Sequence, residues 1–436
     1  MNYIQRWFVT RKLRSNFYGL NREQLIQHQV QAAEKLWAYV RTHSPYYQAL
    51  YPTPIKLSEV AACSKSIMMA HFNQINTENL DRDRLVKFRI EKEKTGRMEY
   101  YKGGYSIGLS SGTSGNRLLT VLSKKERDLY SCLLWARSGV PESVKVIRVL
   151  FALRTYNPTF TEVGAFGARM VYVDYTHPVE TLVELINIKR LNILAGPPSL
   201  LLMIARKSGE IGHPIDAIIS YAEVLDENAK DILVKSFQAP VVQIYQGAEG
   251  FIGSTCRDGN LHINEDVLLV EPVGDQDEGP VSVLLTDLFR RTQPVIRYHL
   301  DDVLEIDSNV CSCGSVFRTI KRIHGRADDV FVLLNQESQP CYLFPDYVRR
   351  AINQASEKIL EYQAIQHSHH RIEIRMILSD EADRAQIETE ILKNLKWRVE
   401  KIGAKLEGVE FSDAPPERND QSKKMVRVIR KFPWNY

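Results

Sequence analysis

The stretch from Val144 to Gln246 constrains the fold most strongly, because short β-rich runs alternate in it with helical patterns. The β-rich runs are VKVIRVLFAL, ARMVYVDY, NILAGPP, DAIISYAE and PVVQIYQ, and the helical patterns between them are VETLVELINIKR, SLLLMIARKSG and DENAKDILVKSF. Strands that alternate with helices in this way form parallel sheets covered by helices. The sequence therefore predicts an α/β protein built around a parallel sheet.

The pattern changes on either side of this stretch. Around residues 22–51 apolar residues recur at intervals of three and four, which predicts an amphipathic helix. From Gly259 to about Asp307 the helical period is lost and short strands are broken by Gly, Pro and Asp turns, which predicts a β-rich subregion. We expect these segments and the parallel sheet to form one large domain over residues 1–327.

Beyond Gly325 a third pattern begins. It consists of a helix over about 345–360, the strand RIEIRMIL, a long helix over about 380–402 and two closing strands. This order is typical of a small α+β domain. We expect it to occupy residues 328–436 and to be separate from the large domain.

Composition and charge restrict the partners and the compartment. Lys and Arg number 57 and Asp and Glu number 53, a net charge of +4 that does not indicate a nucleic-acid partner. No run approaches the ~18 consecutive apolar residues of a membrane helix, and the start, MNYIQRWFVTRKLR, lacks the apolar stretch of a secretion signal. We expect a cytoplasmic protein without an integral membrane segment, and the sequence predicts no particular oligomeric state. The basic, aromatic start leaves a membrane-surface helix as an alternative to an ordinary docking helix.

A run of hydroxyl residues and glycines is the first candidate for chemistry. Its members are Ser110, Ser111, Gly112, Thr113, Ser114 and Gly115. The glycines let backbone N–H groups turn inward and the hydroxyls can donate to one anion, so the run predicts a phosphate-binding loop, with a solvated turn as the alternative. The run also fits the G-x-S-x-G pattern of serine hydrolases, but that motif needs a helix after the serine, and residues 115–122 suit a strand better.

A second candidate follows the last strand of the parallel sheet. Its residues are Tyr245, Gln246, Gly247, Ala248, Glu249 and Gly250. Open α/β sheets bind ligands at the carboxyl ends of their strands, and a carboxylate there can hold Mg²⁺ beside phosphate oxygens. The alternative interpretation of Glu249 is an ordinary surface carboxylate.

Two cysteine-containing segments predict a metal centre. Cys256 and His262 lie six residues apart across a Gly-Asn turn, and Cys311 and Cys313 form a C-x-C pair followed by glycine. Three thiolates and one imidazole complete a tetrahedral Zn²⁺ site, and a site with four protein ligands is structural. The alternative is four unrelated buried residues.

A cluster of three histidines and the three remaining cysteines are not predicted to bind metal. We expect His367, His369 and His370 to be solvated, without an acidic or cysteine partner nearby. The remaining cysteines, Cys63, Cys132 and Cys341, are interpreted as packed thiols.

Three later runs complete a recognisable order of motifs: RYHLDD (297–302), GRADD (325–329) and Lys424-x-x-Arg427. With the two loops above they resemble the core motifs of the adenylate-forming superfamily, which contains acyl-CoA synthetases, luciferase-like enzymes and nonribosomal adenylation domains. The hydroxyl-glycine run resembles its phosphate loop, YQGAE its Tyr-Gly-x-Thr-Glu motif, RYHLDD its Tyr-x-Thr-Gly-Asp motif, GRADD its hinge and Lys424-x-x-Arg427 its catalytic-lysine motif. The resemblance spans nearly the whole chain.

Within that superfamily, TDLFRRTQPVIRY, LHINEDVLLVE and KMVRVI are most similar to the phenylacetate-CoA ligase branch. YQGAEGFIGSTC is closer still to the capsule-cluster adenylate-forming proteins and to the synthetases that adenylylate a methanogen deazaflavin coenzyme. Some members of the branch carry a similar Cys/His zinc cluster. Three positions depart from the superfamily motifs: Gln246 and Asp301 replace glycine, and Ala248 replaces Thr or Ser.

The resemblance implies a role for each motif. Residues 110–115 would hold the ATP phosphates, the Tyr245–Ala248 segment would contact the nucleotide, and Glu249 would bind Mg²⁺. Asp302 would hold the ribose hydroxyls. The residues that would flank the adenine are Ala222 and Glu223. Arg326 would act in catalysis beside the hinge residue Asp328. Lys424, in the small domain, would neutralise charge at the α-phosphate.

The expected function is therefore that of an ATP-dependent, AMP-forming ligase. A carboxylate would attack the α-phosphate of Mg-ATP, pyrophosphate would leave, and the acyl group would pass to a thiol, with coenzyme A as the expected acceptor, after the mobile small domain has rotated. Three alternatives stay open: an adenylyltransferase acting on a hydroxyl, acyl transfer to a carrier protein or an amine, and a catalytically inactive relative. The acid is not identified, but Tyr221, Tyr245 and Phe251 are expected as aromatic walls of its pocket.

Overall fold

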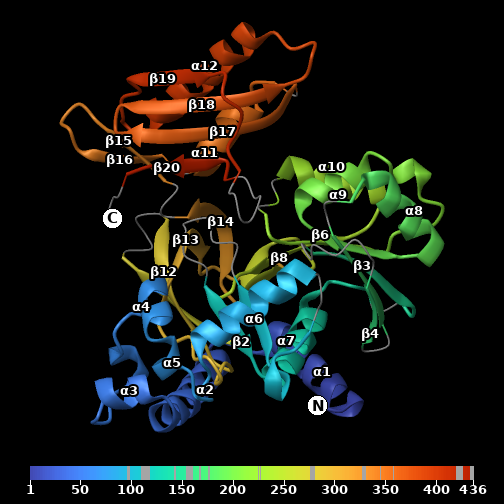
Figure 1. The fold of residues 1–436 in the computed structure, drawn as a ribbon, viewed down its shortest axis with the longest axis vertical. Coiled ribbons are helices and arrows are strands. Elements are labelled where there is room, and N and C mark those ends of the chain that lie inside the picture. Colours follow the sequence, from blue (N-terminus) through green and yellow to red (C-terminus); the bar gives the residue numbers. More distant parts are fainter. Residues whose placement is uncertain are drawn as a thin grey trace.

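The structure is a computed structural model with a central sheet of twelve strands, helices on the faces of that sheet, and a smaller sheet near the C-terminus (Figure 1). It describes residues 1–95, 99–109, 118–141, 144–153, 161–165, 168–174, 177–223, 225, 227–274, 280–326, 330–343, 345–356, 358–418 and 426–432. This mixed α/β architecture confirms the predicted fold class.

One half of the central sheet is parallel. Its strands are β3 (Ile147–Leu153), β5 (Ala168–Asp174), β6 (Ile193–Gly196), β7 (Ala217–Ser220) and β8 (Val241–Gln246), with β4 (Thr161–Ala165) antiparallel at the edge. The helices between them are α8 (Val179–Lys189), α9 (Pro198–Ala205), which leads into a 3-10 turn at Ser208–Glu210, and α10 (Glu227–Phe237). Both faces of β6 and β7 are buried, so their sequences are continuously apolar. The predicted parallel sheet is confirmed.

The other half of the same sheet is antiparallel. Its strands are β9 (Phe251–Thr255), β10 (Leu261–Ile263), β11 (Leu268–Val273), β12 (Val281–Asp287), β13 (Tyr298–Asp307) and β14 (Thr319–Arg326). β8 pairs with β9 in the antiparallel sense, so the β-rich subregion continues the parallel sheet. The sequence predicted these strands but not that they join the first half.

Helices precede the sheet and pack on it. They are α1 (Tyr3–Gly19), α2 (Arg22–His43), α3 (Pro45–Leu50), α4 (Lys65–Ala70), α5 (Phe72–Ile75), α6 (Arg82–Thr95) and α7 (Lys124–Arg137), with 3-10 turns at Leu57–Glu59 and Lys102–Gly104 and the hairpin β1 (Ser106–Leu109) and β2 (Leu119–Leu122) before α7. The single helix expected around residues 22–51 is two helices. Pro45 begins the second one, because proline has no N–H to continue the first and is accepted at a helix start.

The C-terminal part has its own sheet. Its elements are β15 (Phe331–Leu334), β16 (Pro340–Leu343), α11 (Pro345–Asn353), β17 (Ile359–Ser368), β18 (Arg371–Leu378), α12 (Arg384–Lys401), β19 (Gly408–Ser412) and β20 (Val428–Arg430). β19, β18, β17 and β20 form a four-stranded sheet whose buried residues make a core separate from the others. The helix expected over 345–360 is shorter, since β17 begins at Ile359. The boundary placed at residues 327–328 lies outside the described residues and stays a prediction.

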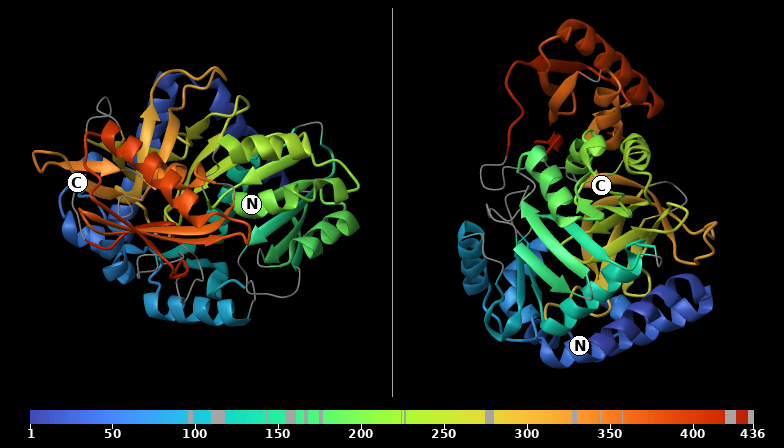
Figure 2. Two further views of the ribbon diagram at one scale, coloured as in Figure 1. Left: turned by 90° about the horizontal axis from the view of Figure 1, so that it is seen from above. Right: turned by 90° about the vertical axis from the view of Figure 1, so that its right-hand side faces the viewer.

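The smaller sheet stands at one end of the molecule, while α1 and α2 lie at the opposite end (Figures 1 and 2). No helix among the described residues is both long enough and apolar enough to cross a bilayer.

Candidate nucleotide site and candidate metal centre

Two of the predicted nucleotide residues meet although they come from distant strands. The hydroxyl of Tyr245, at the end of β8, donates a hydrogen bond of 2.5 Å to Oδ2 of Asp302 on β13. Such a bond to an ionised acceptor is short and strong, so it fixes the direction in which the Asp302 carboxylate points. The structure thus brings YQGAE and RYHLDD to one place.

The carboxylate of Glu249 lies near Tyr298, the first residue of β13. Burial, followed by the nearby charges of Glu249 and Asp301, raises the pKa of Tyr298 far above its ordinary value. Tyr298 begins β13 and is fully buried. Glu249 therefore brings a carboxylate close to the RYHLDD strand, and carboxylate oxygens are ligands that Mg²⁺ prefers.

The loop that carries Glu249 is held by a buried arginine. One nitrogen of Arg290, a residue that is only 2% exposed, donates to the carbonyls of Ala248 at 2.8 Å and of Glu249 at 3.2 Å. Thr120 donates to the same Ala248 carbonyl at 3.2 Å. The loop backbone is therefore fixed by contacts that reach it from β2 and from residues after β12.

A glycine in this loop makes room for the Glu249 side chain. A Cβ built on Gly247 would lie 2.2 Å from Oε2 of Glu249, far inside any allowed contact. The Gly247 N–H also donates to the Gly250 carbonyl at 3.0 Å and closes the turn. The carboxylate can hold its position over the loop only because residue 247 has no side chain.

Two buried acids connect helix α7 to the segment that carries Arg290: Asp287, which binds Tyr130 of α7, and Glu126 of α7 itself. Asp287 accepts from the Tyr130 hydroxyl and, at 3.1 Å, from the Arg290 N–H, and burial raises the pKa of its carboxyl. Burial alone would also raise the pKa of Glu126, but hydrogen bonds from residues such as Thr292 and Ser123 outweigh it and lower that pKa. The segment TDLFRRTQP is thus a brace between α7 and the Glu249 loop.

The residues expected to flank the adenine follow β7. Ala222 has a φ of +67°, in the left-handed region, so the chain turns sharply there. Both the N–H and the hydroxyl of Ser199, near the start of α9, donate to the Glu223 carboxylate at 3.2 and 3.0 Å. The turn is therefore tied to the neighbouring helix.

Aromatic side chains gather at the same ends of the parallel strands. The Tyr221 ring stacks on Phe151 with 5.2 Å between ring centroids and an interplanar angle of 24°, and its hydroxyl donates to the Ala152 carbonyl. Phe251, in contrast, is 1% exposed and packs in the main core. Its expected place in an acyl pocket was wrong, because β9 turns this side chain inward.

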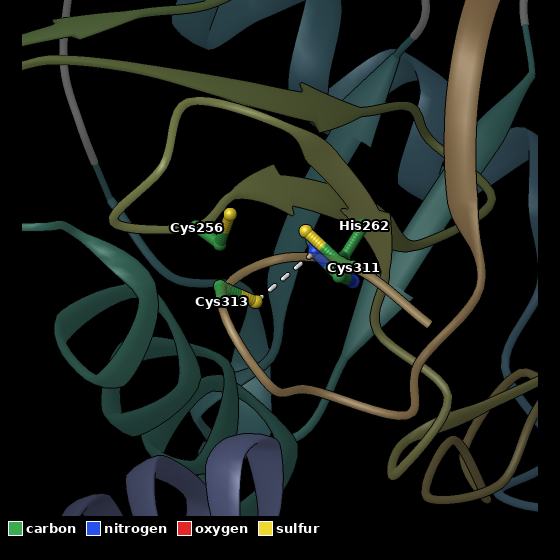
Figure 3. A group of neighbouring side chains, drawn as sticks. All are labelled: Cys256, His262, Cys311 and Cys313. Carbon is green, nitrogen blue, oxygen red and sulfur yellow. Dashed lines mark hydrogen bonds between the residues drawn. The ribbon is translucent and has the colours of Figure 1, made fainter. Parts of the chain in front are cut away.

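The four predicted metal ligands form one cluster. Cys256 follows β9, His262 lies on β10, and Cys311 and Cys313 lie in the connection from β13 to β14. One potential ligand atom from each lies within 4.8 Å of those of all the others (Figure 3). No other group of three or more such ligands occurs in the part of the chain that the structure describes. The two sequence segments therefore meet as expected.

Hydrogen bonds orient the ligand atoms. Nδ1 of His262 donates to the Phe317 carbonyl at 2.8 Å, which turns Nε2 toward Sγ of Cys313, 3.6 Å away. Asn260 donates to Sγ of Cys311 at 3.2 Å. Outer contacts of this kind fix the imidazole tautomer and tune the ligands in metal sites.

Burial and hydrogen bonds shift the pKa values of the four side chains in the cluster. Burial raises the pKa of Cys256, and burial with its sulfur neighbours raises that of Cys313 to about 12. Burial would also raise the pKa of Cys311, but hydrogen bonds from the Cys313 backbone and the Asn260 side chain outweigh it and lower the value. Burial lowers the pKa of His262 and keeps it neutral. Three sulfurs and one neutral imidazole at these separations could hold a tetrahedral metal ion.

The cluster is packed beneath the first two helices. Phe17 of α1 and Leu25 of α2 share a small core with Cys256, Cys313 and Phe317. The Phe17 ring lies 5.2 Å from the His262 ring. The cluster thus joins the N-terminal helices to the antiparallel half of the sheet.

Comparisons with known proteins agree with this architecture. No family model matches the chain. Protein CapK of Staphylococcus aureus is 23% identical over 391 residues, which cover 86% of this chain and 83% of CapK. The structure of 2-hydroxyisobutyryl-CoA ligase in the postadenylation state with R3-HIB-AMP is 16% identical, covers 96% of this chain and 91% of that one, and has a TM-score of 0.65. The anthranilate CoA ligase AuaEII with anthranoyl-AMP is 14% identical over 75% and 66% of the two chains, with a TM-score of 0.52.

The chain has the fold of the adenylate-forming CoA ligases. The fold that the motif resemblance implied is confirmed by these neighbours, and the similarity to CapK supports the relation to capsule-cluster proteins.

Several predicted residues of this adenylate-forming fold lie outside the described residues. They are Ser110, Ser111, Gly112, Thr113, Ser114, Gly115, Asp328 and Lys424. The backbone of Arg326, at the end of β14, pairs with that of Asp302 on β13. The segment that leads to the predicted hinge therefore begins beside the proposed ribose ligand. After the lysine motif, the Arg427 carbonyl accepts from Ala364 at 2.8 Å, which anchors the chain on β17.

Sequence reasoning missed the residues that support the site. Arg290, Asp287 and Tyr130 carry no motif, and an arginine followed by Arg291 looks like a surface pair. Asp287 and Arg290 lie in the segment TDLFRRTQPVIRY, which carried the resemblance but no assigned role, and Tyr130 lies in no segment that was singled out.

The three C-terminal histidines were also misjudged. His367 lies 2.8 Å from the Glu373 carboxylate, and His370 lies 2.7 Å from that of Glu407. Nδ1 of His369 donates to the Val332 carbonyl at 3.0 Å. The expectation that no acidic partner lies nearby was wrong, because the turn between β17 and β18 brings Glu373 back to His367, six residues away, and the approach to β19 brings Glu407 to His370. Each histidine has its own partner.

Proposed function

We propose that the protein is an ATP-dependent ligase that activates a carboxylic acid as an acyl-adenylate. The observation that carries this proposal is the pairing of Tyr245 with Asp302 beside the carboxylate of Glu249. The proposal is supported by the fold, since 2-hydroxyisobutyryl-CoA ligase and anthranilate CoA ligase have been captured with acyl-AMP.

In this proposal Asp302, held by Tyr245, accepts hydrogen bonds from the ribose hydroxyls. Glu249 binds Mg²⁺, which would supply positive charge to the phosphates. Ala222 and Glu223 border the adenine from the turn that Ser199 ties to α9. Residues 110–115 hold the phosphates.

The chemistry asks the protein mainly to position and neutralise. A carboxylate oxygen of the substrate attacks the α-phosphorus, the bond to the β-phosphate oxygen breaks, and pyrophosphate leaves. Lys424 neutralises charge that builds on the α-phosphate, and Arg326 acts beside the hinge. An acid of unknown identity is thereby converted to a mixed anhydride with AMP.

The second half-reaction belongs to the C-terminal domain, over residues 328–436. We expect it to rotate about Asp328 and to present the adenylate to an acceptor thiol, with coenzyme A as the proposed acceptor. A structure of 2-hydroxyisobutyryl-CoA ligase with 2-HIB-AMP and CoA supports this choice by fold. The covalent balance is simple, because the thiol sulfur takes the acyl group and AMP leaves.

The proposed metal is a structural Zn²⁺ held by Cys256, His262, Cys311 and Cys313. All four ligands come from the protein, so no position is left for a substrate. The strand β9 separates Cys256 from the Glu249 loop, which places the centre next to the nucleotide site but outside it. The zinc would stabilise the antiparallel half of the sheet.

Pyrophosphate release tests the proposed function. Purified protein with Mg-ATP is offered aryl, fatty, hydroxy and amino acids, together with the Glu249→Gln variant and the control Glu34→Gln, an exposed glutamate on α2. We expect one acid class to give a signal that Glu34→Gln keeps and Glu249→Gln loses. AMP attached to a hydroxyl compound without any acid would instead identify an adenylyltransferase.

A further inference from the structure

Helix α1 presents an exposed apolar surface, which we call the α1 aromatic patch. It consists of Tyr3, Ile4, Trp7 and Phe8, which are 66%, 64%, 47% and 61% exposed. Tyr3 and Trp7 are four residues apart, as are Ile4 and Phe8, so the two members of each pair are neighbours on the surface of the helix. The other side is used for packing, since α1 buries Leu13 and Phe17. The patch is therefore not needed for the fold.

Positive charge surrounds the patch. The guanidinium of Arg11 lies 5.2 Å from the centre of the Trp7 ring, and Lys12 beside it is exposed. Residues 1–19 contain four basic side chains and no acidic one. Cations along an aromatic helix face are typical of helices that lie in the interface of a membrane.

The basic surface continues onto α7. Lys124 and Lys125 are exposed and line a shallow hollow together with Phe8. The acid in this hollow, Asp128, is already paired with Arg6 and Lys124. The local charge balance therefore favours an anionic partner.

We propose that the α1 aromatic patch docks this protein on the surface of an anionic lipid bilayer. Tyr and Trp prefer the depth of the headgroups, and each cation near an anionic surface adds to the attraction. A second copy of the chain fits the patch less well, because it would bring further basic side chains to a surface that already carries Arg11 and Lys12. An anionic lipid surface meets the aromatic rings and the cations at once.

The position of the patch is compatible with the proposed ligase activity but does not depend on it. α1 lies at the end of the molecule opposite the C-terminal sheet (Figures 1 and 2). A bilayer at that end would leave the C-terminal sheet free to move.

Vesicle sedimentation of the full chain tests the proposal. The probes are vesicles of phosphatidylcholine alone and vesicles with about one third phosphatidylglycerol, at low and high salt, since added salt screens the attraction. We expect sedimentation with the anionic vesicles that weakens as salt is added. A wild-type protein that stays in solution with both kinds of vesicle would overturn the proposal.

Variants identify the surface. Trp7→Ser with Phe8→Ser should weaken vesicle binding by about tenfold or more, and Arg11→Gln with Lys12→Gln by about tenfold on anionic vesicles. The matched control is Trp397→Ser on α12, because Trp397 is 53% exposed and lies 4.1 Å from Lys401 without an exposed aromatic neighbour in sequence. Its binding should equal that of the wild type.

Two results would contradict the proposal on the variants. One is equal loss in Trp397→Ser and in the α1 variants while thermal unfolding is unchanged. The other is a wild-type dimer in sedimentation equilibrium that the α1 substitutions dissociate, which would assign the patch to a second copy. The charge variant keeps the test valid if the aromatic variant does not fold, since it leaves the apolar packing intact.

Discussion

The proposed nucleotide site and the Cys/His cluster lie at opposite ends of β9, and they are built in different ways. The four metal ligands come from two short segments whose turns contain Gly259 and Gly314, at φ of +83° and +86°, and the described chain completes the cluster. The residues of the proposed nucleotide site instead come from β8, β13, the turn after β7 and the end of β14, and its proposed phosphate loop and Lys424 lie outside the described residues. A centre whose ligands lie in two local turns can stabilise the fold. A site whose residues come from several elements can instead change its geometry when those elements move.

The largest expected effect separates the two half-reactions. Lys424→Ala should slow adenylation by about 10² to 10³-fold, because it removes a positive group that stabilises charge in the transition state. Transfer of the acyl group from a supplied adenylate should be spared. Single-turnover assays of each half-reaction measure this difference, and equal loss in both would contradict a lysine that acts only in the first step.

The second prediction concerns the metal cluster. Cys313→Ser should reduce bound zinc from about one ion per chain to very little and lower the melting temperature, because metal binding contributes to folding. Asn260→Ala, which removes the hydrogen bond to Cys311, should lower zinc affinity by about tenfold and leave the fold intact. Metal analysis and thermal unfolding measure both. Full stability without zinc would show that the cluster is not structural.

These predictions also show what the sequence could provide. The sequence could predict that the four Cys/His residues meet, because each pair belongs to a short motif with its own spacing. The Tyr245–Asp302 bond and the Arg290 support were not predictable, because they join residues that are 57 and more than 40 positions apart. Local patterns specify strands, turns and ligands, but the pairing of β8 with β9 that unites the two half-sheets is a tertiary event.

The same limit explains the errors. A helix was expected to run past His43, and the structure ends it there, with Ser44 as the C-cap before Pro45. Phe251 was expected to line a substrate pocket because the sequence does not show which face of β9 turns inward. The structure buries this side chain in the core. Glu373 lies only six residues from His367, but their pairing depends on the β17–β18 hairpin, and Glu407, the partner of His370, is 37 residues away.

A smaller effect is expected at the proposed ribose ligand. Asp302→Asn should raise the KM for ATP by about 10 to 100-fold, which corresponds to the loss of hydrogen bonds to a charged group, with less change in kcat. The control is Asp307→Asn on the same strand, where the carboxylate pairs with Lys321 at 3.0 Å. Initial-rate kinetics with varied ATP compare the two. Equal KM values for Asp302→Asn and the wild type would remove Asp302 from the nucleotide site.

The smallest change tested is a single methyl group. Gly247→Ala should displace the Glu249 carboxylate, because the new Cβ would lie 2.2 Å from its Oε2, and we expect about tenfold slower adenylation with nearly unchanged melting temperature. Gly209→Ala is the matched control, since a Cβ there meets nothing within 4 Å. A fully active Gly247→Ala enzyme would mean that the carboxylate does not work from this position.

The most direct test of the account is ATP–pyrophosphate exchange, which reports reversible formation of an acyl-adenylate and needs no acceptor. Labelled pyrophosphate is followed into ATP in the presence of the acid that gave pyrophosphate release, with the wild type, Glu249→Gln and Cys313→Ser. We predict acid-dependent exchange by the wild type, none by Glu249→Gln, and exchange by the folded fraction of Cys313→Ser. Absence of exchange with every acid, in wild-type protein that binds ATP and retains its fold, would contradict an adenylate-forming ligase.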